Sequence, residues 1–79
     1  MRKRSLTIQG HRTSISLEEP FWMVLNDIAK ARQQSVASLV QMIDKKRVGG
    51  LSSAIRVFIL AELRHQLAAS TTTKTNQIF

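Results

Sequence analysis

The stretch Arg-Thr-Ser-Ile-Ser-Leu-Glu-Glu-Pro, residues 12–20, decides how this chain folds. In its first six residues, β-branched or apolar side chains alternate with Arg or Ser, which is the period-two pattern of a β-strand. The alternation fixes which face is buried, because a slip of one residue would exchange the two faces. The face expected to pack on the protein consists of Thr13, Ile15 and Leu17. The face expected to meet solvent consists of Arg12, Ser14 and Ser16.

Two helices are predicted directly after this strand. Residues 18–20 suit a helix start, because proline is tolerated in the first turn and acidic residues there stabilise the helix dipole. Apolar residues then recur at helical spacing until the polar run 32–34. Ser35 is expected to cap a second helix, which stops near the glycine pair 49–50.

A third helix, capped by Ser52 or Ser53, is predicted to run to about Leu67. The segment 57–61 is apolar on every side of that helix, whereas a surface helix is apolar along one stripe only. We therefore expect another chain to cover part of this helix. Residues 68–79 are polar, lack apolar periodicity and are predicted to form a flexible tail.

Residues 1–11 precede the decisive strand and form either a basic N-terminal arm or an extra strand. The segment 5–9 also alternates, and Gly10 with His11 could close a tight hairpin onto residues 12–17. A flexible arm is the competing interpretation. The pattern leaves both open.

The size and the cysteine count point to a second copy of the chain. A chain of 79 residues holds one domain, and a domain of this size buries little apolar surface. The absence of cysteine excludes disulfides and thiolate zinc sites, and the two histidines, His11 and His65, lie far apart. We therefore expect neither a metal nor a cofactor. Oligomerisation is the remaining way to complete the core, and a homodimer is its simplest form.

The charge balance points to a polyanionic partner. The formal net charge is +7, from 12 Lys and Arg against 5 Asp and Glu. Such a balance favours nucleic acid over anionic membrane, because the cations are not aligned on one helix face. No run approaches the ~20 apolar residues of a membrane span, and no apolar signal-peptide core follows the basic start. We expect a cytoplasmic protein, and we expect it not to be an enzyme, since no catalytic constellation can be assembled.

The strand at residues 12–17 needs a hydrogen-bonding partner, because unpaired backbone donors and acceptors are unstable. Pairing with the same residues of a second chain would give an antiparallel two-stranded ribbon. A two-stranded ribbon fits the major groove of DNA. Its exposed face would then present a cation and small hydroxyls to base edges and phosphates.

Segments 10–22 and 51–60 resemble the ribbon-helix-helix family of DNA-binding proteins (Arc/MetJ-like), and in particular a short bacterial subfamily with an extra C-terminal helix. The resemblance implies a mainly α fold with a short β ribbon over residues 12–67. It implies an intertwined homodimer, in which an antiparallel two-stranded sheet forms between the chains. It also implies a sequence-specific transcription regulator, such as a repressor, that binds double-stranded DNA.

The resemblance assigns roles to individual residues. Alternate strand residues would contact bases, and these are Arg12, Ser14 and Ser16. The backbone at the start of the second helix would bind a phosphate, at Ser35 and Val36. One departure from the family is the polar pair 33–34, which stands where many members have a glycine in the turn.

The residue pattern adds two further groups. The basic arm is expected to contact phosphates through Arg2, Lys3 and Arg4. The expected dimer core comprises Ile15, Leu17, Trp22, Leu39, Ile43, Ile55, Phe58 and Ile59.

The main alternative is an antitoxin-like or accessory protein-interaction module with a protein partner. The short polar tail disfavours it, because such a tail offers few acidic or apolar anchors for a partner. The pattern leaves open whether dimers combine into a higher oligomer on DNA.

Overall fold

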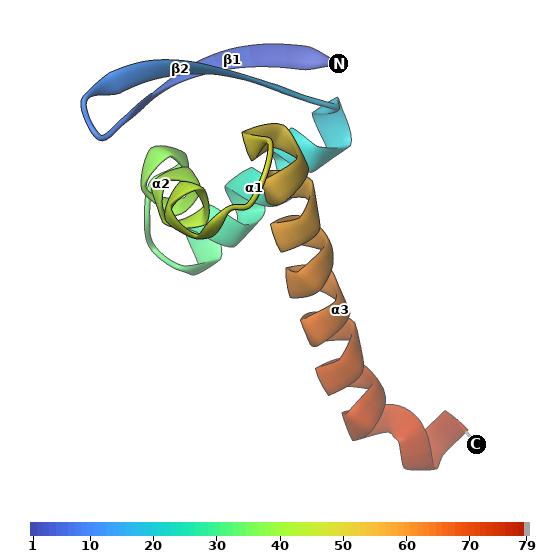
Figure 1. Cartoon of the computed structure of the whole chain (residues 1–79). Coiled ribbons are helices and arrows are strands. Elements are labelled where there is room, and N and C mark those ends of the chain that lie inside the picture. Colours follow the sequence, from blue (N-terminus) through green and yellow to red (C-terminus); the bar gives the residue numbers. More distant parts are fainter. Residues whose placement is uncertain (79) are drawn as a thin grey trace.

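A computed structural model describes the backbone of residues 1–78 and the side chains of residues 1–69. Two antiparallel strands, β1 (Arg2–Ile8) and β2 (His11–Leu17), are followed by three helices. These are α1 (Glu19–Ala31), α2 (Val36–Lys46) and α3 (Leu51–Ile78). The two-stranded ribbon lies across one side of the helices, and α3 projects away from them (Figure 1).

A hairpin turn joins the two strands at Gln9 and Gly10. Both residues have positive φ angles, 52° and 80°, as the favoured two-residue hairpin turns of type I′ require. The sequence pattern places the turn one residue later, at Gly10 and His11. The structure corrects this, because His11 is the first paired residue of β2 and faces Ile8.

The ribbon is therefore complete within one chain. The pattern predicts that residues 12–17 pair with a second copy, but β2 pairs along its whole length with β1. The physical reason is loop closure: a two-residue turn brings β1 to β2 at a much smaller entropic cost than the association of two chains. Of the two interpretations left open for residues 1–11, the structure contains the extra strand.

The inner face of the ribbon and one face of each helix form a single core. Leu17, Leu25, Leu39 and Ile55 are completely buried in it. All the residues predicted for the dimer core are buried here within one protomer, except Phe58, which is partly buried. They belong to the core of the protomer, because the hairpin and three helices of one chain already enclose them.

The cap of α2 follows the prediction, whereas the start of α3 does not. The Ser35 Oγ accepts a hydrogen bond from the Ser38 amide at 3.0 Å, as an N-cap does. Helix α3 begins earlier than predicted, with the Gly50 carbonyl accepting from the Ala54 amide at 3.0 Å. Ser52 and Ser53 thus lie inside its first turn rather than at its cap.

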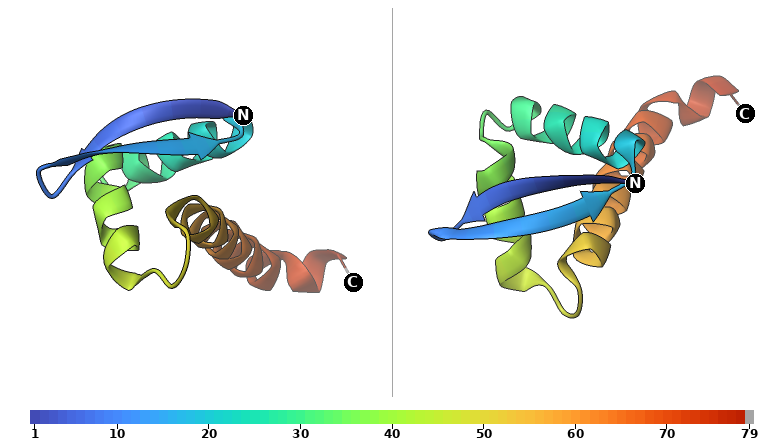
Figure 2. Two further views of the ribbon diagram at one scale, coloured as in Figure 1. Left: turned by 45° about the horizontal axis from the view of Figure 1, so that its top comes forward. Right: turned by 90° about the horizontal axis from the view of Figure 1, so that it is seen from above.

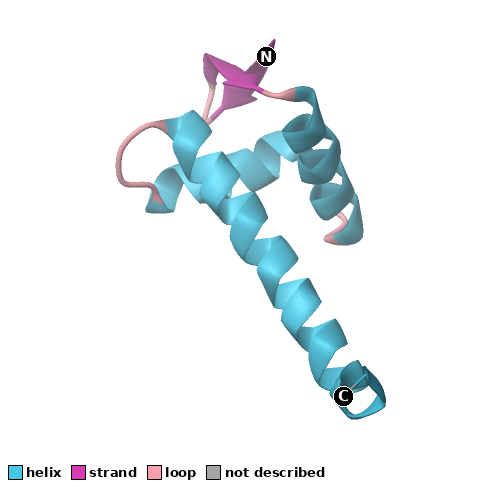
Figure 3. Cartoon of the chain, turned by 90° about the vertical axis from the view of Figure 1, so that its right-hand side faces the viewer, coloured by secondary structure: helices cyan, strands magenta, loops and turns pink. Residues whose placement is uncertain are grey.

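Helix α3 is also longer than predicted. It continues to Ile78, whereas the pattern ends it near Leu67 and leaves residues 68–79 as a flexible tail. No glycine or proline follows Gly50 in the chain, so nothing in the backbone chemistry stops the helix. Figures 1 and 3 show its second half extending well beyond the other helices. Among the described helices, none combines the length and apolar character needed to cross a membrane.

Helix α3 carries a stripe of solvent-exposed apolar side chains. Val57 is 65% exposed, Leu60 56%, Leu63 42% and Leu67 66%. Ile59, on the other side of the helix, is buried. One chain therefore covers only one face of this helix, as the all-round apolar segment predicts.

Candidate nucleic-acid interface

The outer face of the ribbon gathers six side chains that point away from the helices. The register of the hairpin sets them opposite one another in three pairs. The pairs are Lys3 with Ser16, Ser5 with Ser14, and Thr7 with Arg12. All are exposed except Ser16, which is half-buried.

The chemistry of this outer face suits nucleic acid. It combines two cations with four hydroxyls, and residues 1–17 contain no acidic side chain. Hydroxyls donate and accept hydrogen bonds, so they can meet either kind of group on a base edge. Cations bind phosphates and the acceptor edge of guanine. A two-stranded ribbon has the width that the major groove admits.

Contacts with α1 hold the ribbon in place. The Trp22 indole Nε1 donates to the Arg2 carbonyl at 2.9 Å. The Arg2 guanidinium pairs with the Glu19 carboxylate at 3.1 Å, and the Arg4 guanidinium lies over the Trp22 ring, 5.0 Å from its centre. The ribbon is thereby fixed as a surface with a defined orientation.

The structure separates the three cations of the predicted phosphate-contacting arm. Arg2 and Arg4 lie on the inner face of β1, where they approach Glu19 at 3.1 and 4.0 Å. Lys3 lies on the outer face, opposite Ser16. The sequence treats the three alike, but strand alternation sends them to opposite sides. Arg12 forms no ion pair with any described residue, so its charge is available at the surface.

The N-terminus of α2 offers backbone amides beside the ribbon. The Ser38 amide is capped by Ser35, and the amides of Val36 and Ala37 have no partner within the helix. Seen from above, α2 crosses beneath the ribbon (Figure 2), and it packs against β1. The helix dipole makes such a terminus attractive to an anion.

The turn before α2 forms without the glycine that many family members have. Gln33 takes the left-handed conformation with φ of 56°. Its amide donates to the Lys30 carbonyl at 3.1 Å, and the Gln34 amide donates to the Ala29 carbonyl at 3.0 Å. These two bonds are those of a Schellman motif, the usual ending of a helix. The departure from the family thus leaves the geometry of the turn intact.

The corner between the ribbon and α1 is tied to α3 by an ion pair. The Arg56 guanidinium donates to both oxygens of Glu18, at 3.0 and 3.4 Å. The pKa of Glu18 lies below its usual value, first because of a backbone hydrogen bond at Glu18 itself and then because of Arg56. Sequence spacing gives no sign of this pair, since its members lie 38 residues apart.

The sequence interpretation misses Ser5 and Thr7 as site residues. Their signal is the alternation in residues 5–9, which becomes decisive only once the turn at Gln9 and Gly10 sets the register. The predicted base-contacting side chains of Arg12, Ser14 and Ser16 do lie together on the outer face.

One family model matches the chain, and it covers most of it. The ribbon-helix-helix domain matches residues 1–63. This range includes both strands, α1, α2 and the first half of α3. No curated protein and no solved structure matches the chain.

Proposed function

We propose that this chain, which belongs to the ribbon-helix-helix family, is a sequence-specific transcription regulator that inserts its ribbon into the major groove of DNA. Domains of this family generally bind DNA as dimers and act as transcription regulators or antitoxins. The observation that carries the proposal is the outer ribbon face, with two cations, four hydroxyls and no acidic group. Such a regulator works where the chromosome is, which in a bacterium is the cytoplasm.

Each polar group of the surface receives a role. Arg12 contacts a guanine edge or a phosphate, and a bidentate guanine contact contributes about 1–3 kcal/mol of discrimination. Ser14 and Ser16 contact base edges from the same strand. Lys3 and the amides at Ser35 and Val36 hold phosphates and so fix the ribbon in the groove.

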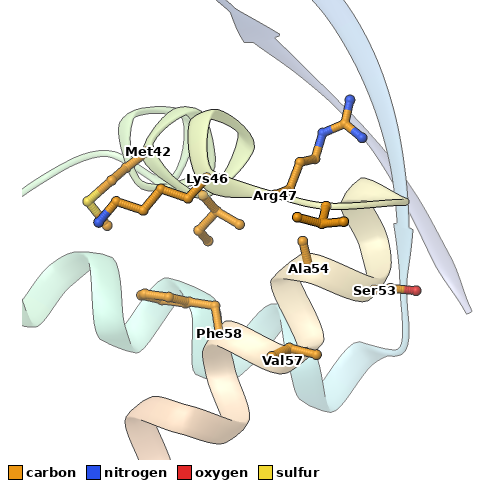
Figure 4. A pocket seen from close by; sticks show the side chains of 9 residues that line it. Met42, Lys46, Arg47, Ser53, Ala54, Val57 and Phe58 are labelled. Atoms are coloured by element: carbon orange, nitrogen blue, oxygen red, sulfur yellow. The ribbon is translucent and has the colours of Figure 1, made fainter.

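A second copy of the chain is the partner we propose for the exposed face of α3. A groove of about 330 Å³ between α2 and α3 is lined mainly by apolar side chains. Figure 4 shows Phe58 and Val57 at this groove, with the Arg47 guanidinium and the Ser53 hydroxyl pointing away from it. Val57 also lines a second apolar groove, with Phe21 and Leu60, on the other side of α3. A protruding apolar ridge and a groove thus adjoin on one surface, as a two-fold symmetric contact requires.

Selection of bound fragments from a randomised duplex pool tests the proposed function. The expected result is an enriched inverted repeat, because a two-fold dimer meets the same half-site twice. Retention without a motif would reduce the protein to a phosphate binder. No retention even at low salt would overturn the DNA proposal and favour an antitoxin-like interaction module.

A charge-reversal pair tests the surface itself. Ser14→Glu with Ser16→Glu places two carboxylates where the groove would lie, and it should abolish DNA binding without disturbing the core. The matched control, Ser53→Glu with Gln66→Glu, adds the same charge at exposed positions on α3 and should bind with little change. Sedimentation of both variants checks that the assembly is intact. Equal loss in both would show that net charge, and not the ribbon, governs binding.

A further inference from the structure

We infer that each protomer is by itself a complete DNA-reading unit, in which β1 supplies the second reading strand through Ser5 and Thr7. The inference rests on the proposed function and extends it. It departs from the two-chain ribbon that the sequence pattern predicts, in which only residues 12–17 of each chain would reach the groove. It also names specificity residues on a segment that the sequence leaves as an arm or strand.

The first support is the geometry of the hairpin. All seven residues of β1 have partners in β2, from Arg2 with Leu17 to Ile8 with His11. Gln9 and Gly10 adopt the positive φ angles that a two-residue turn needs. The strand partner of β2 on this edge is therefore already present, and it belongs to the same chain.

The second support is that β1 is a fixed part of the fold. Ile8 is 5% exposed and packs in the core, and Leu6 packs against it. The Arg2 carbonyl accepts from Trp22, and Arg4 lies over the same ring. A mobile arm would show none of these contacts, so the outward side chains of β1 are held in a defined place.

The third support is the match between the two strands on the outer face. Ser5 lies directly opposite Ser14, and Thr7 lies opposite Arg12. Side chains directly opposite on one face of a sheet lie about 5 Å apart. A groove that receives Ser14 and Arg12 must therefore also meet Ser5 and Thr7. Both are small and hydroxylated, so they fit beside bases without a clash.

The consequence concerns the DNA site. A dimer of such protomers carries two ribbons, so its operator contains two separate half-sites. Their centres should be separated by one helical turn of DNA, about 10 base pairs, or by a multiple of it. A two-chain ribbon would instead place one ribbon per dimer in a single groove segment.

A disulfide test asks whether the ribbon lies within one protomer. The chain has no cysteine, so introduced thiols are the only ones present. The Ile8 and His11 pair closes the turn, and alternation then makes Ser5 and Ser14 a non-hydrogen-bonded pair, with Cα atoms about 4.5 Å apart. Oxidation of the full-length variant Ser5→Cys with Ser14→Cys should give a bridge within the chain, which stays at monomer mass on a non-reducing gel.

The single variant Ser14→Cys is the matched control. Ser14 is the central residue of β2, so a symmetric antiparallel pairing of two β2 strands would set it opposite its own copy. We expect no covalent dimer from this variant. A covalent dimer in high yield would overturn the inference. This result does not depend on DNA, so it is distinct from a failure of the proposed function.

A second experiment tests the reading role of β1. Ser5→Ala and Thr7→Val each remove one hydroxyl from the outer face and should weaken binding to the selected operator about threefold to tenfold, the range for one lost hydrogen bond. They should also change the selected motif, whereas Ser53→Ala on α3 should change neither. If both β1 variants keep the parent's affinity and motif while Ser14→Ala alters them, β2 alone reads the DNA and the inference is wrong.

Discussion

At the scale of single residues, Gln33 carries backbone strain that the fold tolerates. It lies in the left-handed region with φ of 56°, which costs a residue with a side chain roughly 1 kcal/mol more than it costs glycine. We expect Gln33→Gly to raise the free energy of unfolding by about that amount, as measured by urea denaturation. Gln34→Gly is the control, because Gln34 has no positive φ. That variant should lose stability through added freedom in the unfolded chain, and a gain in both variants would contradict the explanation.

Glu18 makes stability depend on pH. Its folded pKa lies below its unfolded value, so its ion pair with Arg56 contributes fully above the unfolded pKa. The contribution is lost as the pH falls through the folded pKa. We expect Glu18→Gln to lower stability at neutral pH and to flatten its fall below the usual carboxyl pKa, as followed by urea unfolding across that range. Arg56→Gln added to this variant should change the pH dependence little further; a steep remaining slope would assign it to other carboxyls.

At the scale of elements, the start of α2 combines a structural cap with the proposed phosphate site. Ser35→Ala removes the acceptor for the Ser38 amide and should cost about 1 kcal/mol of stability. Ser53→Ala, within the first turn of α3, should stay within about 0.5 kcal/mol. Thermal unfolding compares the two.

Ser35→Asp separates the two roles of that helix start. Aspartate is as good an N-cap as serine, so stability should hold, but its charge would repel a phosphate. Fluorescence anisotropy with the selected operator should therefore report weaker binding at unchanged stability. Unchanged binding would remove the start of α2 from the DNA interface.

The elements also show what the sequence alone can predict. Alternation in residues 12–17 is enough to identify β2 and its two faces, and the serine cap is enough to place α2. The turn at Gln9 and Gly10 is harder, because glutamine rarely adopts a positive φ and the glycine invites a turn one residue later. The start of α3 is missed because Ser52 and Ser53 resemble caps, whereas the Gly50 carbonyl opens the helix.

The site is predicted in part for a related reason. The faces of β2 follow from local alternation, so Arg12, Ser14 and Ser16 are found together. The different positions of Lys3 and Arg2 depend on whether residues 1–11 form a strand at all, which local pattern leaves open. The pair of Glu18 with Arg56 depends on the packing of α3, a long-range contact that no local pattern contains.

At the scale of the whole molecule, the ribbon is complete within one chain, so the second copy must be held elsewhere. The exposed stripe on α3 is the surface we propose for that contact, with Leu60 at 56% exposure near its middle. Leu60→Glu places a charge on this stripe without touching the buried face of the helix. We expect the variant to sediment as an 8.9 kDa monomer with its unfolding transition largely retained. Gln66→Glu, with the same product charge on the same helix, should sediment like the parent protein.

The same variant links assembly to DNA recognition. If each protomer reads a half-site by itself, monomeric Leu60→Glu should still protect one half-site. Its affinity for the full operator should fall by a factor on the order of 10²–10⁴, which is the gain that two linked binding sites usually supply. Footprinting on an operator with one half-site scrambled makes the comparison, because the monomer should bind it nearly as well as the intact operator. A monomer that binds no half-site at high concentration would tie the reading surface to the dimer, and a variant that sediments like the parent would move the dimer contact away from α3.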